Sequence, residues 1–163
     1  KDGLTGVLNR EAFYSETKRD SKDITAIITL DMNGLKLIND TYGHAAGDEA
    51  LITLALCFTK SVKVRQSVYR MGGDEFVVIM LGEHASSCTK RIHEFHSLMS
   101  DWNRKEQVFQ YSASYGYAYS YEVPNASSNE VYMLADSRMY EMKKEHHGRK
   151  EMEHEMEEVN ANA

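Results

Sequence analysis

The sequence has one proline, two cysteines and no long apolar run among its 163 residues. Cys57 and Cys88 lie far apart in segments with a helical pattern. That spacing is not typical of a disulfide framework or a metal site, so we expect two reduced thiols in a cytoplasmic protein. No stretch approaches the ~20 apolar residues of a membrane-spanning helix, and no signal peptide opens the chain. We therefore expect no membrane contact by this domain.

Positive charge is also scarce. The chain has 19 Lys and Arg against 25 Asp and Glu, which gives a formal net charge of -6. No basic stripe is interleaved with aromatic residues, and this argues against nucleic acid as a partner. A nucleotide that arrives with its own divalent metal ion is compatible with this charge. The hydrophobic share of 42% and the charged share of 27% are those of a globular domain.

Hydrophobic periodicity predicts an α+β sandwich around a mixed sheet, because strands alternate with helices and include one hairpin. The predicted strands are 24–32, 68–71, 76–81 and 109–121, and the predicted helices are 11–19, 35–40, 48–62, 85–102 and 129–144, with Ser128 as cap of the last. A loop is expected over 41–47. One domain is expected over residues 1–150. The charged tail 151–163 is expected to be a frayed helix or disordered.

Three carboxylates stand where strands end. Asp31 closes the most apolar strand, and Asp74 and Glu75 follow Gly72-Gly73 at the hairpin tip. If the two strands are neighbours, these side chains converge, and magnesium prefers such oxygen ligands. Two metal ions there would activate a hydroxyl and stabilise charge on a phosphate. Acidic residues at turns are also common as plain solvated residues, so the pattern alone leaves both interpretations open.

The segment RMGGDEF at 70–76 resembles the signature of GGDEF-domain diguanylate cyclases. Further segments match the family in order, and they are DGLTGVLNR at 2–10, DMNGLKLINDTYGHAAGDEAL at 31–51, SASYGYA at 112–118 and ADSRMY at 135–140. The resemblance runs from about residue 2 to 149. It implies a central mixed, mostly antiparallel five-stranded sheet flanked by helices, like a polymerase palm or nucleotidyl cyclase. It also implies condensation of two GTP into cyclic di-GMP with release of pyrophosphate.

The resemblance assigns the catalytic metal site. Asp31 and Asp74 would bridge two Mg²⁺ or Mn²⁺ ions, helped by the main-chain carbonyl of Met32. Glu75 would support or join this site. The general base stays open between Asp74 and Glu75, since a carboxylate bound to metal is a poor base.

The resemblance also assigns substrate-binding residues near the first strand. Asn39 and Asp48 would read the guanine edge, because an amide and a carboxylate match its donors and acceptor. The N–H groups of the turn at Gly34 and Leu35 would face the β- and γ-phosphates at the start of a helix. Lys36 lies beside them, either as a phosphate ligand or as an exposed helix lysine.

Two glycines and two basic residues complete the predicted site. Gly72 and Gly73 permit positive φ and leave room for a phosphate, although they are equally explained by the hairpin turn. Lys143 occupies the family's phosphate-binding lysine position. Arg149 is either the arginine that follows it or part of the tail. The family has four residues from that lysine to that arginine, whereas here the interval is six.

Catalysis is expected to need a two-fold homodimer in which each domain binds one GTP, so that the isolated domain is weakly active. An N-terminal sensory or regulatory domain of a longer chain is expected as a partner, and whether that longer protein is anchored in a membrane is left open. The stretch Lys63–Gln66 does not have the arginine and aspartate of the family's product-binding motif at the matching places, so product inhibition through that motif is not expected. The alternative function is a catalytically inactive GTP-binding GGDEF regulatory domain.

Overall fold

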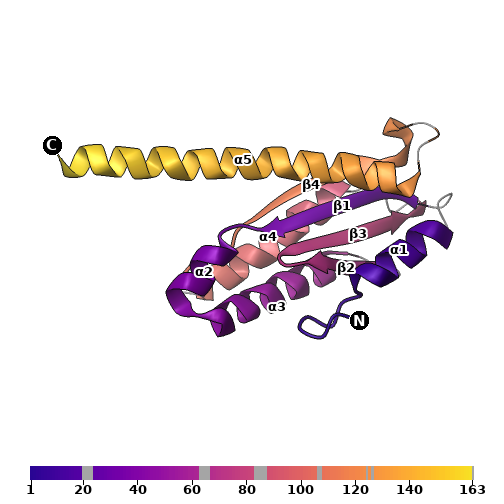
Figure 1. The fold of residues 1–163 in the computed structure, drawn as a ribbon, viewed down its shortest axis with the longest axis horizontal. Helices are drawn as coiled ribbons and strands as arrows, with labels where there is room; N and C mark the ends of the chain where they lie inside the picture. The colour runs from indigo at the N-terminus through magenta and orange to yellow at the C-terminus, as the bar shows by residue number, and fades with distance from the viewer. Residues whose placement is uncertain are drawn as a thin grey trace.

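The computed structural model describes residues 1–19, 24–62, 67–82, 88–105, 108–123, 125 and 127–162. The described residues form four strands, and Figure 1 shows the helices around them. The elements are α1 (Arg10–Arg19), β1 (Ile24–Met32), α2 (Leu35–Tyr42), α3 (His44–Ser61), β2 (Ser67–Gly72), β3 (Glu75–Leu81), α4 (Cys88–Lys105), β4 (Ala113–Tyr119), η2 (Ser120–Glu122) and α5 (Ser128–Ala161). The α+β class expected from the sequence is confirmed.

The sheet has the strand order β2-β3-β1-β4, and all its ladders are antiparallel. The expected count of five strands is wrong for the described residues, which form four. Leu8 adds one parallel bridge beside β2, with its N–H bonded to Val68 O at 3.0 Å and its carbonyl to Arg70 N at 2.8 Å. The pairing with β2 stops after this bridge because the chain enters α1 at the next residues. Asn9 Oδ1 accepts from Ala12 N at 2.9 Å and so caps the start of that helix.

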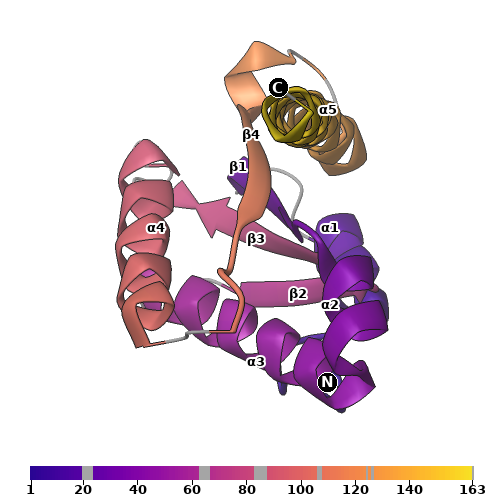
Figure 2. The ribbon, with the colours of Figure 1, turned by 90° about the vertical axis from the view of Figure 1, so that its left-hand side faces the viewer.

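Helices cover both faces of the sheet. Figure 2 shows α3 and α4 on one side of the sheet, with α1 and α5 on the other. Neighbouring residues of β1 are buried on opposite faces of the sheet. Ile28 packs with Phe58 and Phe95 on one face, and Ile27 packs with Phe13 and the start of α5 on the other. The continuous apolar run of β1 follows from this double burial.

Two predicted segments, the loop and the last strand, have other bounds in the structure. The loop expected over 41–47 is wrong, because α2 runs to Tyr42 and α3 begins at His44. Gly43, with φ of 94°, makes the whole connection. The last strand is shorter than expected, because β4 covers Ala113–Tyr119 and the chain then enters η2. Residues 85–87 of the predicted fourth helix lie outside the described residues.

Helix α5 is longer than the predicted helix over 129–144. Its cap is Ser127 rather than Ser128, since the Ser127 hydroxyl accepts from Glu130 N. The helix continues through the charged tail to Ala161, and Figure 1 shows its C-terminal part extending beyond the sheet. Side-chain pairs one turn apart, such as His154 with Glu158 at 3.1 Å, support this part. Within the described ranges, no helix combines the length and apolar character of a membrane span.

Candidate functional site

Strand pairing brings the three predicted carboxylates together. Asp31 lies opposite Glu75 in the ladder between β1 and β3. Met32 N–H donates to the Asp74 carbonyl at 3.1 Å and ties the hairpin tip to the end of β1. Asp31 is only 6% exposed, whereas Asp74 and Glu75 are half-buried. The buried Asp31 therefore lies beside two half-buried carboxylates at the hairpin tip.

Lys143 completes this cluster from α5. Its Nζ lies 2.7 Å from Asp31 Oδ2 and 3.8 Å from Asp74 Oδ2. The other oxygen of Asp31, Oδ1, is buried and has no hydrogen-bond partner in the described part of the chain. The Lys143 ammonium group thus lies beside carboxylate oxygens of Asp31 and Asp74, while Asp31 Oδ1 has no partner among the described residues. The described residues contain no complete group of three or more metal-ligating side chains, so these oxygen donors suit a divalent cation that brings further ligands with it.

Burial and mutual repulsion govern the charges of the cluster. Burial, and after it the neighbouring Asp74 carboxylate, raise the pKa of Asp31 to about 7, although Lys143 acts in the opposite direction. Burial likewise raises the pKa of Glu75 to about 7, against a hydrogen bond from Tyr132 that lowers it. For Lys143, burial opposes the charged form, but Asp31 outweighs this effect and the pKa is raised. The ionised forms of Asp31 and Glu75 are therefore costly in the metal-free chain, and a bound cation would relieve that cost.

The predicted guanine-reading residues lie on neighbouring helices. Asn39 is half-buried on α2, and Asp48 is exposed near the start of α3. Between them is Gly47, where an added Cβ would lie 1.8 Å from Asn39 Oδ1. The missing side chain at Gly47 thus seats the Asn39 amide against α3, next to Asp48. Sequence reasoning did not single out Gly47, because nothing local distinguishes it from other helical glycines.

The guanine contact that the family resemblance implies for Asn39 predicts that Gly47→Ala raises the KM for GTP about tenfold, because the new methyl group would displace the Asn39 amide and leave that contact unmade. The melting temperature should not fall, since alanine is the better helix former by ~1 kcal/mol. Steady-state kinetics with GTP check this, with Ala45→Ser on the same helix as the control. An unchanged KM in the Gly47 variant would contradict this account.

The turn after β1 is held by residues that the sequence did not reveal. Gly34 adopts φ of 72° ahead of α2, and Leu35 begins that helix half-buried. Asn33 Nδ2 donates to Ser112 Oγ at 2.8 Å, and Ser114 Oγ donates to Asn33 Oδ1 at 2.8 Å. The two serines are two residues apart and so share a face, which is the one sequence signal that could have indicated them. Lys36 is exposed on α2.

The hairpin tip is supported by the N-terminal turn. Gly72 and Gly73 have φ of 149° and 50° and are exposed. Arg70 donates to the Gly73 carbonyl through Nε at 3.0 Å and Nη2 at 2.7 Å, and its Nη1 pairs with the Asp2 carboxylate at 3.2 Å. Asp2 in turn accepts from the Thr5 hydroxyl at 2.6 Å. The first residues therefore anchor the tip that carries Asp74, a role that the sequence reading missed.

Arg149 lies on α5 and is exposed. Six residues of α-helix turn by about 600°, so the directions of Arg149 and Lys143 are about 120° apart around the axis. Four residues turn by only about 40° beyond a full turn, and that position holds His147, which pairs with Glu151 at 3.1 Å. A phosphate-binding role for Arg149 stays a prediction from the sequence.

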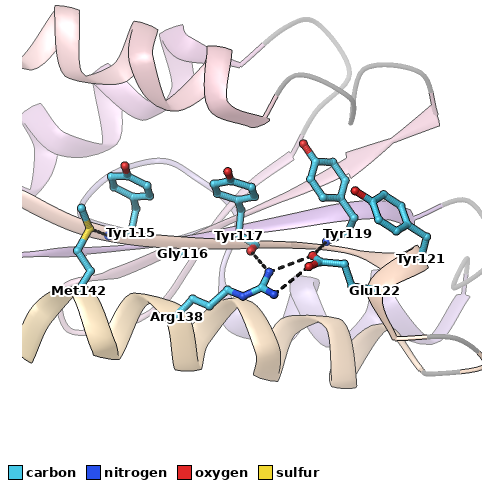
Figure 3. Close-up of a pocket in the computed structure, with 8 residues that line it drawn as sticks. All are labelled: Tyr115, Gly116, Tyr117, Tyr119, Tyr121, Glu122, Arg138 and Met142. Atoms are coloured by element: carbon cyan, nitrogen blue, oxygen red, sulfur yellow. Dashed lines mark hydrogen bonds and ion pairs between the residues drawn. The ribbon is translucent and has the colours of Figure 1, made fainter.

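A separate hollow of about 540 Å³ follows the outer edge of β4 (Figure 3). None of the predicted site residues lines it. Arg138 donates to the Tyr117 carbonyl at 2.8 Å and pairs with both oxygens of Glu122, which also accepts from Tyr119 N at 2.9 Å. Side chains thus occupy the outward backbone groups of this edge strand, which protects it from pairing with another strand. We do not assign this hollow to the substrate.

Comparisons with known proteins agree with this arrangement. The family described as "Diguanylate cyclase, GGDEF domain" matches residues 1–149. The chain is 34% identical over 151 residues to diguanylate cyclase DgcN of Escherichia coli, covering 87% of this chain and 36% of DgcN. It is 31% identical over 152 residues to diguanylate cyclase DgcS of Shewanella oneidensis, covering 87% of this chain and 49% of DgcS. The chain thus spans between about a third and a half of these relatives.

A solved structure shows the same fold. The crystal structure of the GGDEF domain of DgcB from Caulobacter crescentus in complex with c-di-GMP superimposes with a TM-score of 0.78 at 28% identity. The match covers 88% of this chain and 90% of that chain. Because the family match extends over nearly all the residues that build the sheet and its carboxylate cluster, the chain belongs to the GGDEF domain family of diguanylate cyclases.

Proposed function

We propose that this domain condenses two GTP molecules into cyclic di-GMP at a two-fold dimer interface, with two divalent metal ions in each site. The observation that supports it most strongly is the contact of Lys143 with Asp31 and Asp74 beside an unpaired, buried carboxylate oxygen. A site with this much uncompensated negative charge suits metal ions and the phosphates that come with them.

Each group of residues has a role in this proposal. Asp31, Asp74, Glu75 and the Met32 carbonyl would hold Mg²⁺ or Mn²⁺, which lowers the pKa of an attacking hydroxyl and neutralises charge on the phosphate. Asn39 and Asp48 would hydrogen-bond the guanine edge. The turn at Gly34 and Leu35 would take the terminal phosphates at the start of α2, and Lys143 would move from Asp31 to a phosphate oxygen. We expect lesser contributions from Lys36, Gly72, Gly73 and Arg149.

The reaction is phosphoryl transfer between the two half-sites. The 3′-oxygen of one GTP attacks the α-phosphorus of the other. This forms one O3′–P bond, breaks the bond to the β-phosphate and releases pyrophosphate and the hydroxyl proton. A second, symmetric transfer closes the ring. One domain holds only one of the two substrates, so dimerisation supplies the proximity on which the rate depends.

The test is product formation from GTP and Mg²⁺ by the chain fused to a dimerising coiled coil. Wild type should form cyclic di-GMP, and Asp74→Ala should lower the rate on the order of a thousandfold, because both metal charge compensation and Lys143 placement are lost. Asp101→Ala, at an exposed acidic residue on α4, is the control and should be fully active.

Two other outcomes are informative. If GTP with Mg²⁺ raises the melting temperature but the dimerised chain forms no product, the domain is a GTP-binding regulatory module. If millimolar GTP produces no shift at all, both nucleotide-binding proposals are wrong.

A further inference from the structure

The strongest contact that the proposed roles leave unused is between Tyr132 and Glu75. The Tyr132 hydroxyl donates to Glu75 Oε1 at 2.6 Å, across 57 positions of sequence. This is the short distance of a phenol that donates to a carboxylate. The Tyr132 ring is half-buried and packs against Phe13, with ring centroids 5.2 Å apart. The donor is therefore fixed in place before any ligand binds.

The surroundings of Glu75 explain why a fixed donor matters. Asp31 lies opposite Glu75 in the sheet. The Asp136 carboxylate, one turn after Tyr132 on α5, repels the Glu75 carboxylate electrostatically. Asp136 Oδ1 is buried and finds no hydrogen-bond partner in the described ranges. Glu75 thus lies between two like charges, each of which tends to push its carboxylate away. Tyr132 supplies a neutral hydrogen bond that holds it.

Tyr132 also shares a face of α5 with the site lysine. Eleven residues separate Tyr132 from Lys143, which is three turns to within about 20°. One face of this helix therefore carries one group to Asp31 and another to Glu75, which are cross-strand neighbours. The same packing of α5 on the sheet positions both.

We propose that Tyr132 is a positioning residue, which fixes the Glu75 carboxylate toward the metal-binding cluster and so sets the affinity of this domain for its divalent ions. The inference rests on the proposed function, because it assigns Glu75 to that cluster. Groups that orient a metal ligand typically change metal affinity or activity by about 10- to 100-fold when removed.

The experiment uses Tyr132→Phe in the dimerised chain. The first measurement is the Mg²⁺ concentration that gives half-maximal product formation from GTP. The second is the Mn²⁺ affinity, measured by electron paramagnetic resonance in the presence of 3′-deoxy-GTP, a nucleotide that cannot cyclise. We expect both to weaken about tenfold, with the KM for GTP changed less than twofold. The melting temperature should fall by no more than a few degrees, because phenylalanine keeps the packing on Phe13 and only one hydrogen bond is lost.

Two further variants make the test specific. Tyr14→Phe removes a hydroxyl from a ring of the same aromatic cluster, whose edge contact with Phe13 is kept, and it should leave metal affinity unchanged. In a Glu75→Gln background, Tyr132→Phe should have no further effect on metal affinity, because Tyr132 acts through the carboxylate alone.

The outcomes separate this inference from the proposed function. If wild type forms product and Tyr132→Phe matches it in Mg²⁺ dependence and Mn²⁺ affinity, the positioning role is wrong and the cyclase proposal stands. The role is equally wrong if Tyr132→Phe and Glu75→Gln weaken metal binding additively. If wild type forms no product, the cyclase proposal fails, and the Mn²⁺ measurement still decides the role of Tyr132. If wild type binds no Mn²⁺, both proposals fail.

Discussion

Asp31→Asn is expected to abolish product formation while making the metal-free chain more stable at pH 8. The pKa of Asp31 is raised from 3.8 to about 7 in the folded chain. Between these values the folded state binds more protons than the unfolded state, so the stability of the wild type falls as the pH rises through this window and is lowest above pH 7. Asparagine removes that cost and should increase stability at pH 8 by about 1–3 kcal/mol, after the loss of the Lys143 ion pair.

Urea denaturation with a metal chelator at pH 6 and pH 8 checks this prediction. The wild type should be less stable at pH 8 than at pH 6, and the difference should shrink in Asp31→Asn. Asp101→Asn controls for the removal of one acidic charge. With Mg²⁺ and GTP present the order should reverse, because only the wild type is stabilised by binding. An Asp31→Asn chain that is less stable than wild type at pH 8 without metal would refute the argument.

Gly116→Val is expected to lower the stability of the chain by about 3 kcal/mol or more. An added Cβ at Gly116 would lie 2.2 Å from the Ala135 carbonyl oxygen and 2.4 Å from Met139 N. Both are backbone atoms of α5, so no side-chain rotation can relieve the clash, and the helix has to move off β4. Lys143 is part of the same helix and would move away from Asp31, so activity should fall as well.

Thermal unfolding measures this effect, and a fall of about 6–12 °C corresponds to 3 kcal/mol for a domain of this size. Gly148→Ala is the matched control. It is a glycine of the same helix with nothing within 4 Å of an added Cβ, and alanine there should raise stability slightly. Equal melting temperatures for Gly116→Val and wild type would show that α5 does not pack as tightly on β4 as the structure indicates.

The parts of the fold that are local in sequence could be predicted. The apolar run of β1 with Asp31 at its end and the glycine hairpin before Asp74 both have chemical signatures in a few adjacent residues. The convergence of Asp31 with Glu75 needed only the correct pairing of β1 with β3. The resemblance to a known family added Lys143, which nothing local distinguishes from its neighbour Lys144.

The rest depends on contacts that only the folded chain makes. Arg70 with Asp2, Asn33 with Ser114, and Tyr132 with Glu75 each join residues far apart in sequence, between residue types that are common at any surface. The fifth strand was expected from the family rather than from the residues. In the described residues, the segment at Leu8 forms a single bridge beside β2, because Asn9 caps α1 immediately after it.

Helix α5 also gives this domain the mechanics of a lever. Its 34 residues form a rod of about 51 Å, and its backbone lies directly against the sheet at Gly116 beside Ala135. About that pivot, a tilt of roughly 10° moves the backbone at Lys143 by about 2 Å and at Ala161 by about 7 Å. The Lys143–Asp31 ion pair is 2.7 Å long, so such a shift would require the Lys143 side chain to rearrange or the contact to lengthen. A force applied to the far end of the helix is thus transmitted to the carboxylate cluster by a single stiff element.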